Sequence, residues 1–516
     1  MRYALDSEGM KRVDNYTTEE IGIPALVLME RAALETVNIM KRNLRKEDRI
    51  LVVCGPGNNG GDGVAAGRIL FLQGYQVALL FICGEAGFSS QMKLQASIAG
   101  KLGMTVETSN KLGEYNIIID AIFGVGLSRP VDGVYEAVIN EINGSNHTVY
   151  SIDTPSGISA DNGSILKAAV RADYTITFGY MKRGLLVYPG AAYAGEITVA
   201  EIGFPEIALQ RAEPDTFYFG VEDLMGLPVR KAYSHKGTYG RVLVIAGSKG
   251  MGGAAYLAAK AAYRTGAGLV EVLTASDNRT ILQTLLPEAI FTAYDMNQRQ
   301  ESELMEELHG SIHSATAIVI GPGLGREKRT GELLDLVLRQ AKVPVVFDAD
   351  ALNLLSERLD REGLHLTEDR QKRLIQILPE ASVLTPHLME LSRLTGISTK
   401  VISDNIIDTA DQCSYNNKLI YAIKDARSIV AQDGRKYINR SGNNGMATGG
   451  SGDVLTGIIA ALIAQGLCSY DAACLGVYLH GYAGDVAAEV KGTYSLIAGD
   501  IIDAIEKVLQ NKEQLM

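Results

Sequence analysis

Two glycine-rich stretches carry side chains that could do chemistry. The first, CGPGNNGGDG (residues 54–63), stands between an apolar run and a helix-like segment. Its spaced glycines fit a G-x-G-x-x-G pattern, in which backbone N–H groups at a helix N-terminus approach a pyrophosphate. A tight strand-to-helix turn uses the same glycines, so the spacing alone leaves both interpretations open. The amides of Asn58 and Asn59 and the carboxylate of Asp62 are not needed for a turn, and they favour a binding site.

The second stretch, GNNGMATGGSGDVLTG (residues 442–457), lacks the Lys-Ser/Thr pair of a Walker A loop and is therefore not a P-loop. Gly449, Gly450 and Gly452 precede Asp453, which opens a long predicted helix. Consecutive N–H groups at a helix start can bind an anion, and a carboxylate beside them can exchange a proton with a reacting hydroxyl. Asp453 could instead only cap the helix. Because a cap does not require three glycines, the sequence favours an anion-binding catalytic loop.

Polar side chains follow three further predicted strands. Asp120 ends one strand and is followed by a glycine-containing loop at residues 124–130, while Asp153 and Ser156 end the next strand and Lys182 follows a later one. The carboxyl ends of parallel strands converge on one crevice, so we expect these groups to meet there. Two alternatives stay open: Asp120 could cap the following turn, and Lys182 could be a solvated surface lysine.

Asn59, Asp120 and Ser156 form a possible cation site with oxygen ligands only. No histidine or cysteine stands with them, which favours a hard cation over zinc. One charge among several neutral oxygens suits a monovalent ion better than a divalent one.

The elements that must position these groups follow an α/β alternation. Short β-branched runs alternate with amphipathic segments, which predicts a doubly wound, Rossmann-like parallel sheet in the N-terminal half and a second α/β domain behind it. We expect strands at residues 49–55, 75–83, 115–124 and 148–157, a preceding helix at 21–44, and two long Ala- and Leu-rich helices at 454–466 and 472–490 that close the chain.

The length of 516 residues predicts two domains. The strand rhythm lapses between residues 207 and 233, where the sequence is polar and irregular. We therefore predict an N-terminal domain at residues 1–212, a linker at 213–224 and a C-terminal domain at 225–516. The two halves differ in pattern and do not read as a duplication.

Composition excludes several classes of protein. A net charge of −11, 6% aromatic residues and no tryptophan argue against nucleic-acid binding. Five cysteines without CxxC spacing suit a reducing compartment and argue against a disulfide framework or a zinc site. The N-terminus has no apolar signal core, and no uncharged run reaches the ~20 residues that span a bilayer. We expect a soluble cytoplasmic protein, and the Ala-rich terminal helices would suit a homo-oligomer.

The N-terminal motifs GIPALVLMERAA, GPGNNGGDG, DAIFGVG, DTPSG and VYPGA resemble, in this order, the NAD(P)H-hydrate epimerase family over residues 1–210. The resemblance implies K⁺ held by Asn59, Asp120 and Ser156. It also implies that Asp153 and Lys182 are catalytic. The substrate-binding residues that it implies are Asn58, Asn59, Gly60, Gly61, Asp62, Gly124, Val125, Gly126, Leu127, Ser128, Arg129, Pro130, Tyr135 and Asp153.

The C-terminal half, residues 225–510, resembles the ribokinase-like superfamily through its GGSGD loop and HLME segment. More narrowly, the GPGLG, DADALNLL and LTPHLMEL motifs resemble the ADP/ATP-dependent NAD(P)H-hydrate dehydratases. The resemblance implies ADP or ATP with Mg²⁺, Asp453 as the base, and hydrate substrate near Gly253, Gly323, His387 and Asp453. The nucleotide-binding residues that it implies are Lys424, Asp425, Ala426, Arg427, Ser428, Asn444, Thr448, Gly449, Gly450, Ser451 and Gly452.

One position departs from the sugar kinases, which carry Asn-x-x-Glu where this chain has His387-x-x-Glu390. That departure favours the dehydratases over a small-molecule kinase. His387 could still be a satisfied buried histidine, and Glu390 a solvent-side or supporting group. Asp348 and Asp350 could belong to a phosphate or magnesium site, and Asp350 could equally cap a helix.

Together the two resemblances imply a bifunctional repair enzyme for hydrated NADH and NADPH. The first half would interconvert the R and S hydrates, and the second would dehydrate the S hydrate with ADP or ATP, releasing phosphate and AMP or ADP. Two alternatives remain: a hydroxymethylpyrimidine- or sugar-kinase-like enzyme with an accessory nucleotide-binding N-terminal domain, and an N-terminal half that only binds nucleotides or a protein. No residue decides between ADP and ATP or between the two hydrates.

Overall fold

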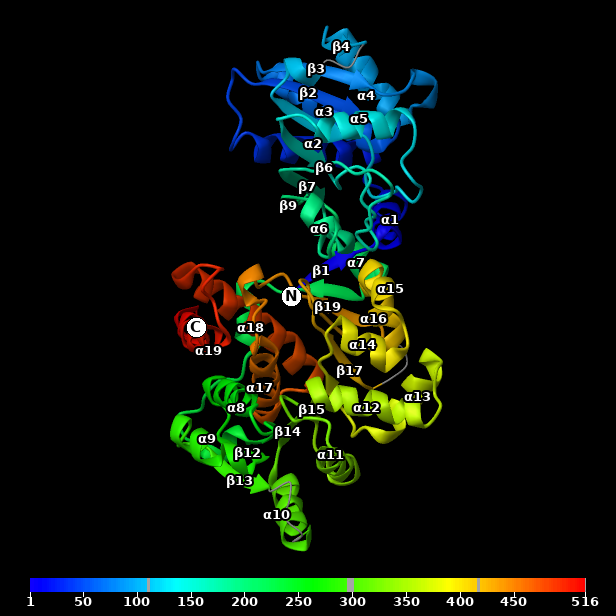
Figure 1. Cartoon of the computed structure of the whole chain (residues 1–516). Coiled ribbons are helices and arrows are strands. Elements are labelled where there is room, and N and C mark those ends of the chain that lie inside the picture. The colour runs from blue at the N-terminus through cyan, green and yellow to red at the C-terminus, as the bar shows by residue number, and fades with distance from the viewer. Residues whose placement is uncertain (109–111, 295–300, 415–417, 516) are drawn as a thin grey trace. The chain divides into compact units, whose positions relative to one another are not determined.

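The computed structural model describes residues 1–108, 112–294, 301–414 and 418–515 (Figure 1). The chain forms two compact units, one of residues 3–217 and one of residues 218–516 together with the first two residues. The division falls inside the stretch predicted as a linker, within the short strand β10 (Thr216–Tyr218), all of which lies in that stretch. Among the described residues, no helix is both long and apolar enough to span a bilayer.

The first unit is built on a seven-stranded sheet whose strands are all parallel. Their order is β4-β3-β2-β5-β6-β7-β9, so the chain direction across the sheet reverses between β2 and β5, the place where doubly wound sheets bind ligands. The predicted Rossmann-like α/β sheet is confirmed. The strands are β2 (Arg49–Cys54), β3 (Gln76–Phe81), β4 (Thr105–Glu107), β5 (Ile117–Ala121), β6 (Thr148–Ile152), β7 (Tyr174–Phe178) and β9 (Glu196–Ala200).

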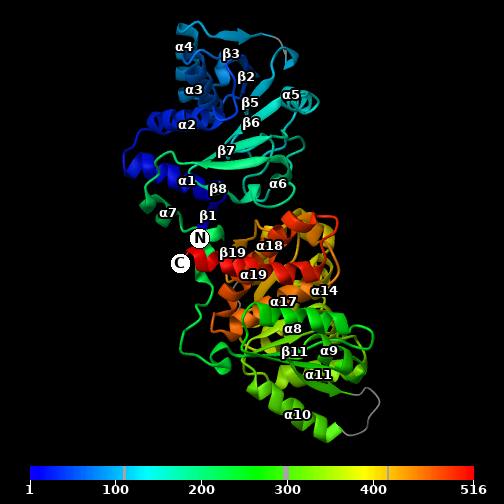
Figure 2. The same cartoon turned by 90° about the vertical axis from the view of Figure 1, so that its left-hand side faces the viewer.

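Helices cover both faces of this sheet, as Figure 2 shows. Successive residues of β2 point to opposite faces, so Val52 packs in the core under α2, α3 and α4, while Val53 packs in the core under α5. Burial on both faces explains why these strands are continuously apolar in sequence. The helices are α2 (Ala25–Met40), α3 (Asn58–Leu72), α4 (Ser90–Lys101), α5 (Val134–Asn143), α6 (Gly190–Tyr193) and α7 (Glu206–Ala212).

A short pairing outside the main sheet places the first helix of the chain. Strand β1 (Arg2–Leu5) runs parallel to β8 (Met181–Lys182), with Leu5 opposite Lys182. Helix α1 (Ser7–Asn15) follows directly and therefore begins beside Lys182. The sequence patterns did not predict either element.

The second unit has a sheet in the order β13-β12-β11-β14-β15-β16-β17-β18-β19. Pairing is parallel from β13 to β17, and β18 and β19 add antiparallel strands at one end. The strands are β11 (Arg241–Ile245), β12 (Leu269–Ala275), β13 (Ile290–Tyr294), β14 (Ala317–Ile320), β15 (Val345–Phe347), β16 (Val383–Leu384), β17 (Ile420–Ile423), β18 (Ile429–Gln432) and β19 (Arg435–Ile438).

Helix α17 is the most buried helix of this unit, since every residue from Val454 to Ala464 is buried. It packs beside α8 and α18. The helices are α8 (Gly252–Arg264), α9 (Arg279–Leu285), α10 (Glu301–Ser314), α11 (Lys328–Gln340), α12 (Ala349–Arg361), α13 (Thr367–Ile377), α14 (Leu388–Thr395), α15 (Thr399–Asp404), α16 (Ile406–Ser414), α17 (Ser451–Ala464), α18 (Ser469–Lys491) and α19 (Ala498–Leu515).

The prediction that two long helices close the chain is wrong, because α19 follows them. Its apolar residues recur at helical spacing, and Ile501, Ile505 and Val508 are buried. Its polar side carries Asp503, which pairs with Lys260 of α8 at 3.1 Å. This amphipathic pattern is weaker than the continuous Ala and Leu runs of α17 and α18.

We predict that two glycines of the α3 turn differ sharply in tolerance to alanine. A Cβ on Gly60 would lie 2.1 Å from the carbonyl oxygen of Gly55, whereas a Cβ on Gly57 would meet nothing within 4 Å. Gly60→Ala must shift the backbone and should destabilise the first unit by about 1–3 kcal/mol. Gly57→Ala is the matched control and should leave the melting temperature within about 1 °C of wild type, given about 2–4 °C per kcal/mol for a domain of this size. Equal melting temperatures for both variants by circular dichroism would contradict this packing.

Candidate functional site

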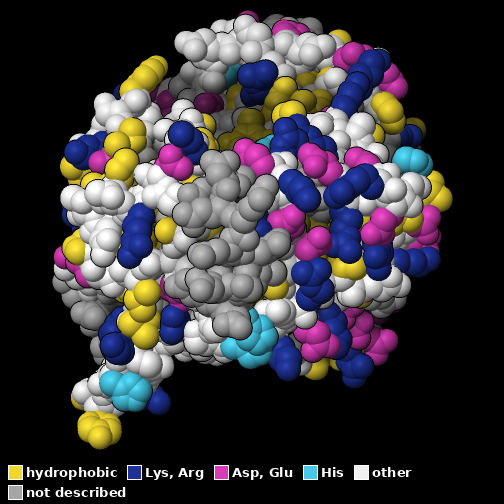
Figure 3. Space-filling model, turned by 60° about the horizontal axis from the view of Figure 1, so that its bottom comes forward, with side chains coloured by type: hydrophobic (Ala, Val, Ile, Leu, Met, Phe, Trp, Pro, Cys, Tyr) yellow, Lys and Arg dark blue, Asp and Glu magenta, His cyan; other side chains and the backbone are white. Residues whose placement is uncertain are grey.

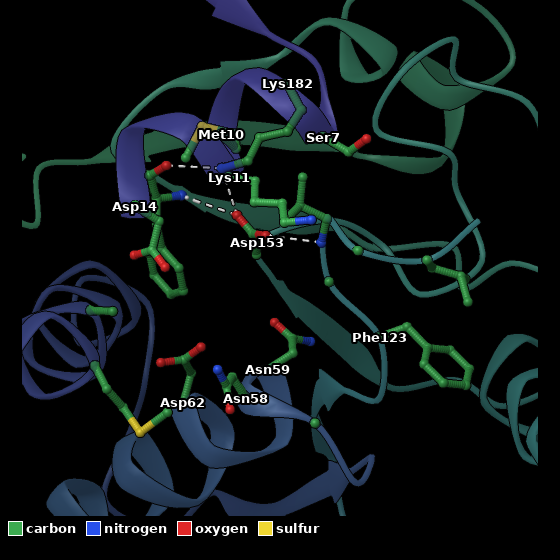
Figure 4. A pocket seen from close by; sticks show the side chains of 18 of the residues that line it. Ser7, Met10, Lys11, Asp14, Asn58, Asn59, Asp62, Phe123, Asp153 and Lys182 are labelled. Carbon is green, nitrogen blue, oxygen red and sulfur yellow. Dashed lines mark hydrogen bonds and ion pairs between the residues drawn. The ribbon is translucent and has the colours of Figure 1, made fainter. Parts of the chain in front are cut away.

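The first unit contains a cavity of about 800 Å³ at the carboxyl ends of β2, β5 and β6 (Figure 4). The start of α3 forms one wall, the 124–130 loop another, and α1 closes the opposite side. The strand ends thus converge as the sheet pattern predicts. Of the residues predicted to bind substrate or act in catalysis, those lining it are Asn58, Asn59, Asp62, Gly124, Val125, Gly126, Leu127, Ser128, Arg129, Asp153 and Lys182.

Four residues predicted as substrate contacts, Gly60, Gly61, Pro130 and Tyr135, are not among the described residues that line the cavity. Gly60 and Gly61 face protein, since their added Cβ atoms would meet Gly55 and Met29 respectively. The Tyr135 ring packs on Phe123, with 4.9 Å between ring centroids. Their predicted contact with substrate stays a prediction.

Asp153 and Lys182 form a buried ion pair with 2.6 Å between Oδ1 and Nζ. The Lys182 side chain is fully buried, so the alternative of a solvated lysine is wrong. Its ammonium also donates to the carbonyl of Phe178 at 2.8 Å. The second Asp153 oxygen accepts from the N–H of Val125 at 3.1 Å. One carboxylate therefore joins the end of β6, β8 and the 124–130 loop.

Asp62 lies in the same cavity on α3, opposite α1 (Figure 4). Burial raises the pKa of its carboxyl well above the ordinary value, and the negative charges of Asp153 and Asp14 raise it further. The cavity therefore holds two carboxyls in different surroundings: Asp153 is paired with a lysine ammonium, whereas no ion pair of Asp62 is among its described contacts. Two carboxyls in different environments can serve as proton donor and proton acceptor in one site.

Asp120 and Ser156 lie side by side at the ends of β5 and β6. The four groups that donate to the fully buried Asp120 carboxylate are all neutral: the N–H of Ile122, the Oγ of Ser151, and the N–H and Oγ of Ser156. Burial raises the pKa of Asp120 despite these donors. The bond from Ile122 shows that Asp120 does cap the following turn, but it is one contact of four.

Asn59 faces the same region from α3. A Cβ on Gly124 would lie 2.9 Å from its Oδ1 and 3.2 Å from Asp153 Oδ2. Its Nδ2 is buried, and the described residues offer it no hydrogen-bond partner. A bound group that contacts this amide would account for that unsatisfied atom.

Helix α1 supplies cavity residues that the sequence analysis missed. Figure 4 shows Ser7, Met10, Lys11 and Asp14 on the side opposite α3. The N–H of Ser7 donates to Asp161 at 2.7 Å, which fixes the start of the helix to the loop after β6. The sequence did contain a signal for the start of this helix, because Asp6 is an N-cap that accepts from the N–H of the third residue after it. An N-cap does not show where in the fold the helix packs.

The second unit places Asp453 in the first turn of α17. Gly450 is the N-cap residue, at φ +89°, and it has no side chain to accept from the first-turn N–H groups. These groups are thus available to an anion. The alternative that Asp453 only caps the helix is wrong. Burial raises the pKa of Asp453 to about 7, the charge of Asp348 raises it, and Lys424 opposes the shift.

Lys424, at the end of β17, is surrounded by acids. Its Nζ lies 2.5 Å from Asp348 and 3.9 Å from Glu390. Burial alone would lower the pKa of Lys424, but the charges of Asp348, Glu390 and Asp453 outweigh it and leave the pKa raised. A Cβ on Gly452 would lie 3.3 Å from this Nζ, so the ammonium stands directly behind the glycine loop.

His387 and Glu390 cap α14 reciprocally. The ring Nδ1 of His387 accepts from the N–H of Met389 at 3.1 Å, and Glu390 accepts from the N–H of His387 at 2.9 Å. The imidazole is about half exposed, so the alternative of a buried histidine is wrong. Glu390 is only 5% exposed, which excludes the solvent-side alternative and leaves a supporting role beside Lys424.

Gly323 lies in a loop that contacts the loop before α8, since the N–H of Ser248 donates to the carbonyl of Gly323 at 2.6 Å. Gly253 is the second residue of α8, and a Cβ added to it would meet nothing within 4 Å. Asp350 accepts from the N–H of Gly325 at 2.8 Å. Asp350 therefore stabilises the loop that contains Gly323. This role was not predicted for Asp350.

Apart from the glycine loop itself, the residues predicted to hold a nucleotide lie in three places. Lys424 lies in the acidic cluster, while Asp425, Ala426, Arg427 and Ser428 form the turn between β17 and β18. Asn444 and Thr448 line a second, smaller pocket of about 390 Å³ beside the glycine loop. Contact of any of them with a nucleotide stays a prediction.

Two further features of the structure are the distribution of surface charge and the grouping of possible metal ligands. On the face drawn in Figure 3, acidic and basic side chains are interspersed and form no single-sign patch. Within the described part of the chain, no three His, Cys, Asp or Glu side chains are grouped as a metal would require.

Comparison with known proteins covers both units. A family described as YjeF-related protein N-terminus matches residues 25–184, and a family described as NAD(P)H-hydrate dehydratase matches residues 242–507.

Two relatives match over nearly the whole chain. The bifunctional NAD(P)H-hydrate repair enzyme of Thermofilum pendens is 36% identical over 99% of this chain and 96% of its own. The enzyme of the same name from Moorella thermoacetica is 36% identical over 99% and 97%. Among solved structures, a ribokinase-like superfamily protein from Enterococcus faecalis is similar with a TM-score of 0.50 and 29% identity, over 58% of this chain and 96% of that protein.

Proposed function

The chain belongs to the family of bifunctional NAD(P)H-hydrate repair enzymes, and we propose that its two units divide the repair between them. The first unit interconverts the R and S hydrates of NADH and NADPH. The second, ribokinase-like unit dehydrates the S hydrate with ADP or ATP. The observation that carries this division is the presence of two separate acid–base centres, Asp153 with Asp62 in one unit and Asp453 in the other.

The first cavity suits exchange at one carbon. The hydrate has a hydroxyl on C6 beside the ring nitrogen, so the C6–O bond can break with the nitrogen electron pair. Asp62, whose pKa is raised by burial, donates a proton and the hydroxyl leaves as water. Water then adds to the other face of C6, Asp153, kept in place by Lys182, takes the excess proton, and exchange with solvent returns a proton to Asp62. Lys11 and Arg129 at the cavity can face the phosphates of the dinucleotide.

The second site suits removal of the hydroxyl. Asp453 accepts the hydroxyl proton while oxygen attacks the terminal phosphoryl group of ADP or ATP, whose charge the α17 N-terminus stabilises. Phosphate is a better leaving group than hydroxide, so the C6–O bond breaks with the nitrogen pair. A proton then passes from C5 to the released phosphate, which restores the ring double bond. The products are NADH or NADPH, phosphate, and AMP or ADP.

Two metal ions fit the residues present. Asp120, Ser156 and the Oδ1 of Asn59 would hold K⁺, which supplies positive charge beside a buried carboxylate whose described donors are all neutral. Mg²⁺ would accompany the nucleotide, since it commonly binds through phosphates, water and one or two carboxylates. Asp348 or Glu390 could assist it only by giving up contacts to Lys424 or His387.

We expect substitutions in the two units to separate the activities. Asp453→Asn should abolish recovery of reduced-nicotinamide absorbance and leave epimer exchange intact, because only dehydration uses that base. Asp153→Asn and Asp62→Asn should slow epimer exchange at least ~100-fold, the usual contribution of a general acid or base, and leave dehydration of pure S hydrate intact. Both activities are followed by absorbance and by chromatography of the hydrates.

Asp153→Asn also leaves the buried Lys182 charge unpaired, at a cost of about 3–5 kcal/mol. Asp153→Asn/Lys182→Met removes both charges and controls for unfolding, with thermal melts of each variant. Loss of both activities in one folded variant would mean that the sites are not independent. A stable phosphorylated product in place of free phosphate would instead support the kinase alternative.

The dehydration rate should increase with pH through about 7. A base must be ionised, and burial raises the pKa of Asp453 to about 7, so kcat/KM for the hydrate should rise about ten-fold from pH 6 to pH 8. Lys424→Met removes a charge that opposes this shift and should move the midpoint to higher pH. A flat profile between pH 5.5 and 8.5 would rule out Asp453 as the base.

K⁺ should stabilise the first unit through Asp120. The melting temperature of wild type should rise when K⁺ replaces a bulky organic cation, because an ion that binds only the folded state stabilises it. Asp120→Asn should lose this response, and its epimer exchange should no longer depend on K⁺. Val64→Ile, in the α3 core, should keep the response. An equal response in wild type and Asp120→Asn would place the ion elsewhere.

Three further expectations belong to this proposal. The mixed surface of Figure 3 and the net charge of −11 agree with small-molecule ligands and no nucleic acid. Cytoplasmic location and a homo-oligomeric state stay predictions. Size-exclusion chromatography with light scattering tests the homo-oligomeric state.

A further inference from the structure

An unassigned feature of the second unit is the wholly exposed ring of Tyr494. It lies on the turn between α18 and α19, and its side chain is as exposed as in an extended peptide. The same turn supplies Thr493, Tyr494 and Leu496 to one wall of the 390 Å³ pocket, whose other wall includes Asn444 and Thr448. No role was predicted for the three residues of this turn.

The turn is anchored on both sides of Tyr494. A Cβ on Gly445 would lie 2.6 Å from the carbonyl oxygen of Thr493, so the backbones of the two walls touch. Leu496 is buried, and the N–H of Ile497 donates to Asp500 at 3.0 Å, which starts α19. Tyr494 is thus an exposed ring on a fixed backbone.

The turn also touches the glycine loop. A Cβ on Gly450 would lie 3.2 Å from the Cβ of Ala498, the first residue of α19. The pocket therefore adjoins the N-terminus of α17, where the phosphates are proposed to bind. A nucleotide whose phosphates occupy that N-terminus would have its nucleoside within reach of the pocket.

The pocket suits a neutral, planar, polar group. Its lining residues carry no ionised side chain, and its volume is in the range of small-ligand sites. Asn444 can donate and accept hydrogen bonds at the edge of a base. Stacking on a heteroaromatic base is favourable for an exposed tyrosine ring. Any type of base can stack in this way, because every base has a π-face.

We propose that Tyr494 stacks on the adenine base of the phosphate donor, with Asn444 at the base edge. This inference rests on the proposed use of ADP or ATP by the second unit. It assigns the pocket to the donor and not to the adenine of the hydrate, because the pocket adjoins the loop at which the donor phosphates are proposed to bind.

The chain has no tryptophan, so Tyr494→Trp gives a single fluorescent reporter at this position. Titration with ADP in the absence of hydrate should quench or shift the tryptophan emission, and this change should level off as the site fills. Tyr233→Trp is the matched control, because Tyr233 is equally exposed in the same unit but outside the pocket, and it should not respond. A response to NADH and none to ADP, or no response to either, would overturn the assignment.

Kinetics provide the second readout. Tyr494→Ala should raise KM for ADP and ATP about 5- to 150-fold, the range for loss of one base stack, and leave kcat nearly unchanged. Tyr494→Phe should keep KM near the wild-type value, since it retains the ring. An unchanged KM in Tyr494→Ala would overturn the inference. Failure of wild type to convert any hydrate would instead overturn the proposed function, whatever the fluorescence shows.

Discussion

A buried ion pair organises the first site. Lys182 has no exposed surface, so its charge must be balanced by the Asp153 carboxylate at 2.6 Å and by the Phe178 carbonyl. Desolvation makes such a pair costly unless its remaining hydrogen bonds are satisfied. That requirement explains why Asp153 also accepts from Val125, and why β8 stays next to the end of β6. Since β1 pairs with β8, the same ion pair indirectly sets the position of α1 over the cavity.

Both units place one lysine among several carboxyls, with different results. In the first unit Lys182 pairs with Asp153, while burial and the charges of Asp153 and Asp14 raise the pKa of Asp62 well above its ordinary value. In the second unit Lys424 contacts Asp348 and Glu390, and its charge also lowers the pKa of Asp453 against the effect of burial, which leaves the latter near 7. A raised pKa at Asp62 suits the proton donor that we propose for epimer exchange. A pKa of about 7 at Asp453 suits the base that we propose for dehydration.

The sequence predicted those parts of the sites that lie at strand ends. Asp120 and Asp153 follow continuously apolar runs, and parallel strands necessarily bring their carboxyl ends together. Helix α1 could not be placed, because only two residues of β8 pair with β1 and such a short pairing leaves no pattern. Tyr494 could not be predicted either, since an aromatic residue in a turn looks the same whether it faces solvent or a pocket. The buried position of Glu390 depends on Lys424, which is 34 residues away in sequence and adjacent only in the folded sheet.

The two glycine-rich turns show why spacing alone could not separate their roles. At the start of α3, a Cβ on Gly55 would lie 1.9 Å from the Ile122 carbonyl, so glycine is needed there for backbone packing, and the site chemistry comes from the side chains of Asn59 and Asp62. At the start of α17, a Cβ on Gly449 would meet nothing within 4 Å. Gly450, the N-cap residue of α17, likewise has no side chain that could accept from the first-turn N–H groups, which is why we propose that these groups bind the phosphates. Glycine spacing is therefore compatible with both kinds of site, and the neighbouring side chains must distinguish them.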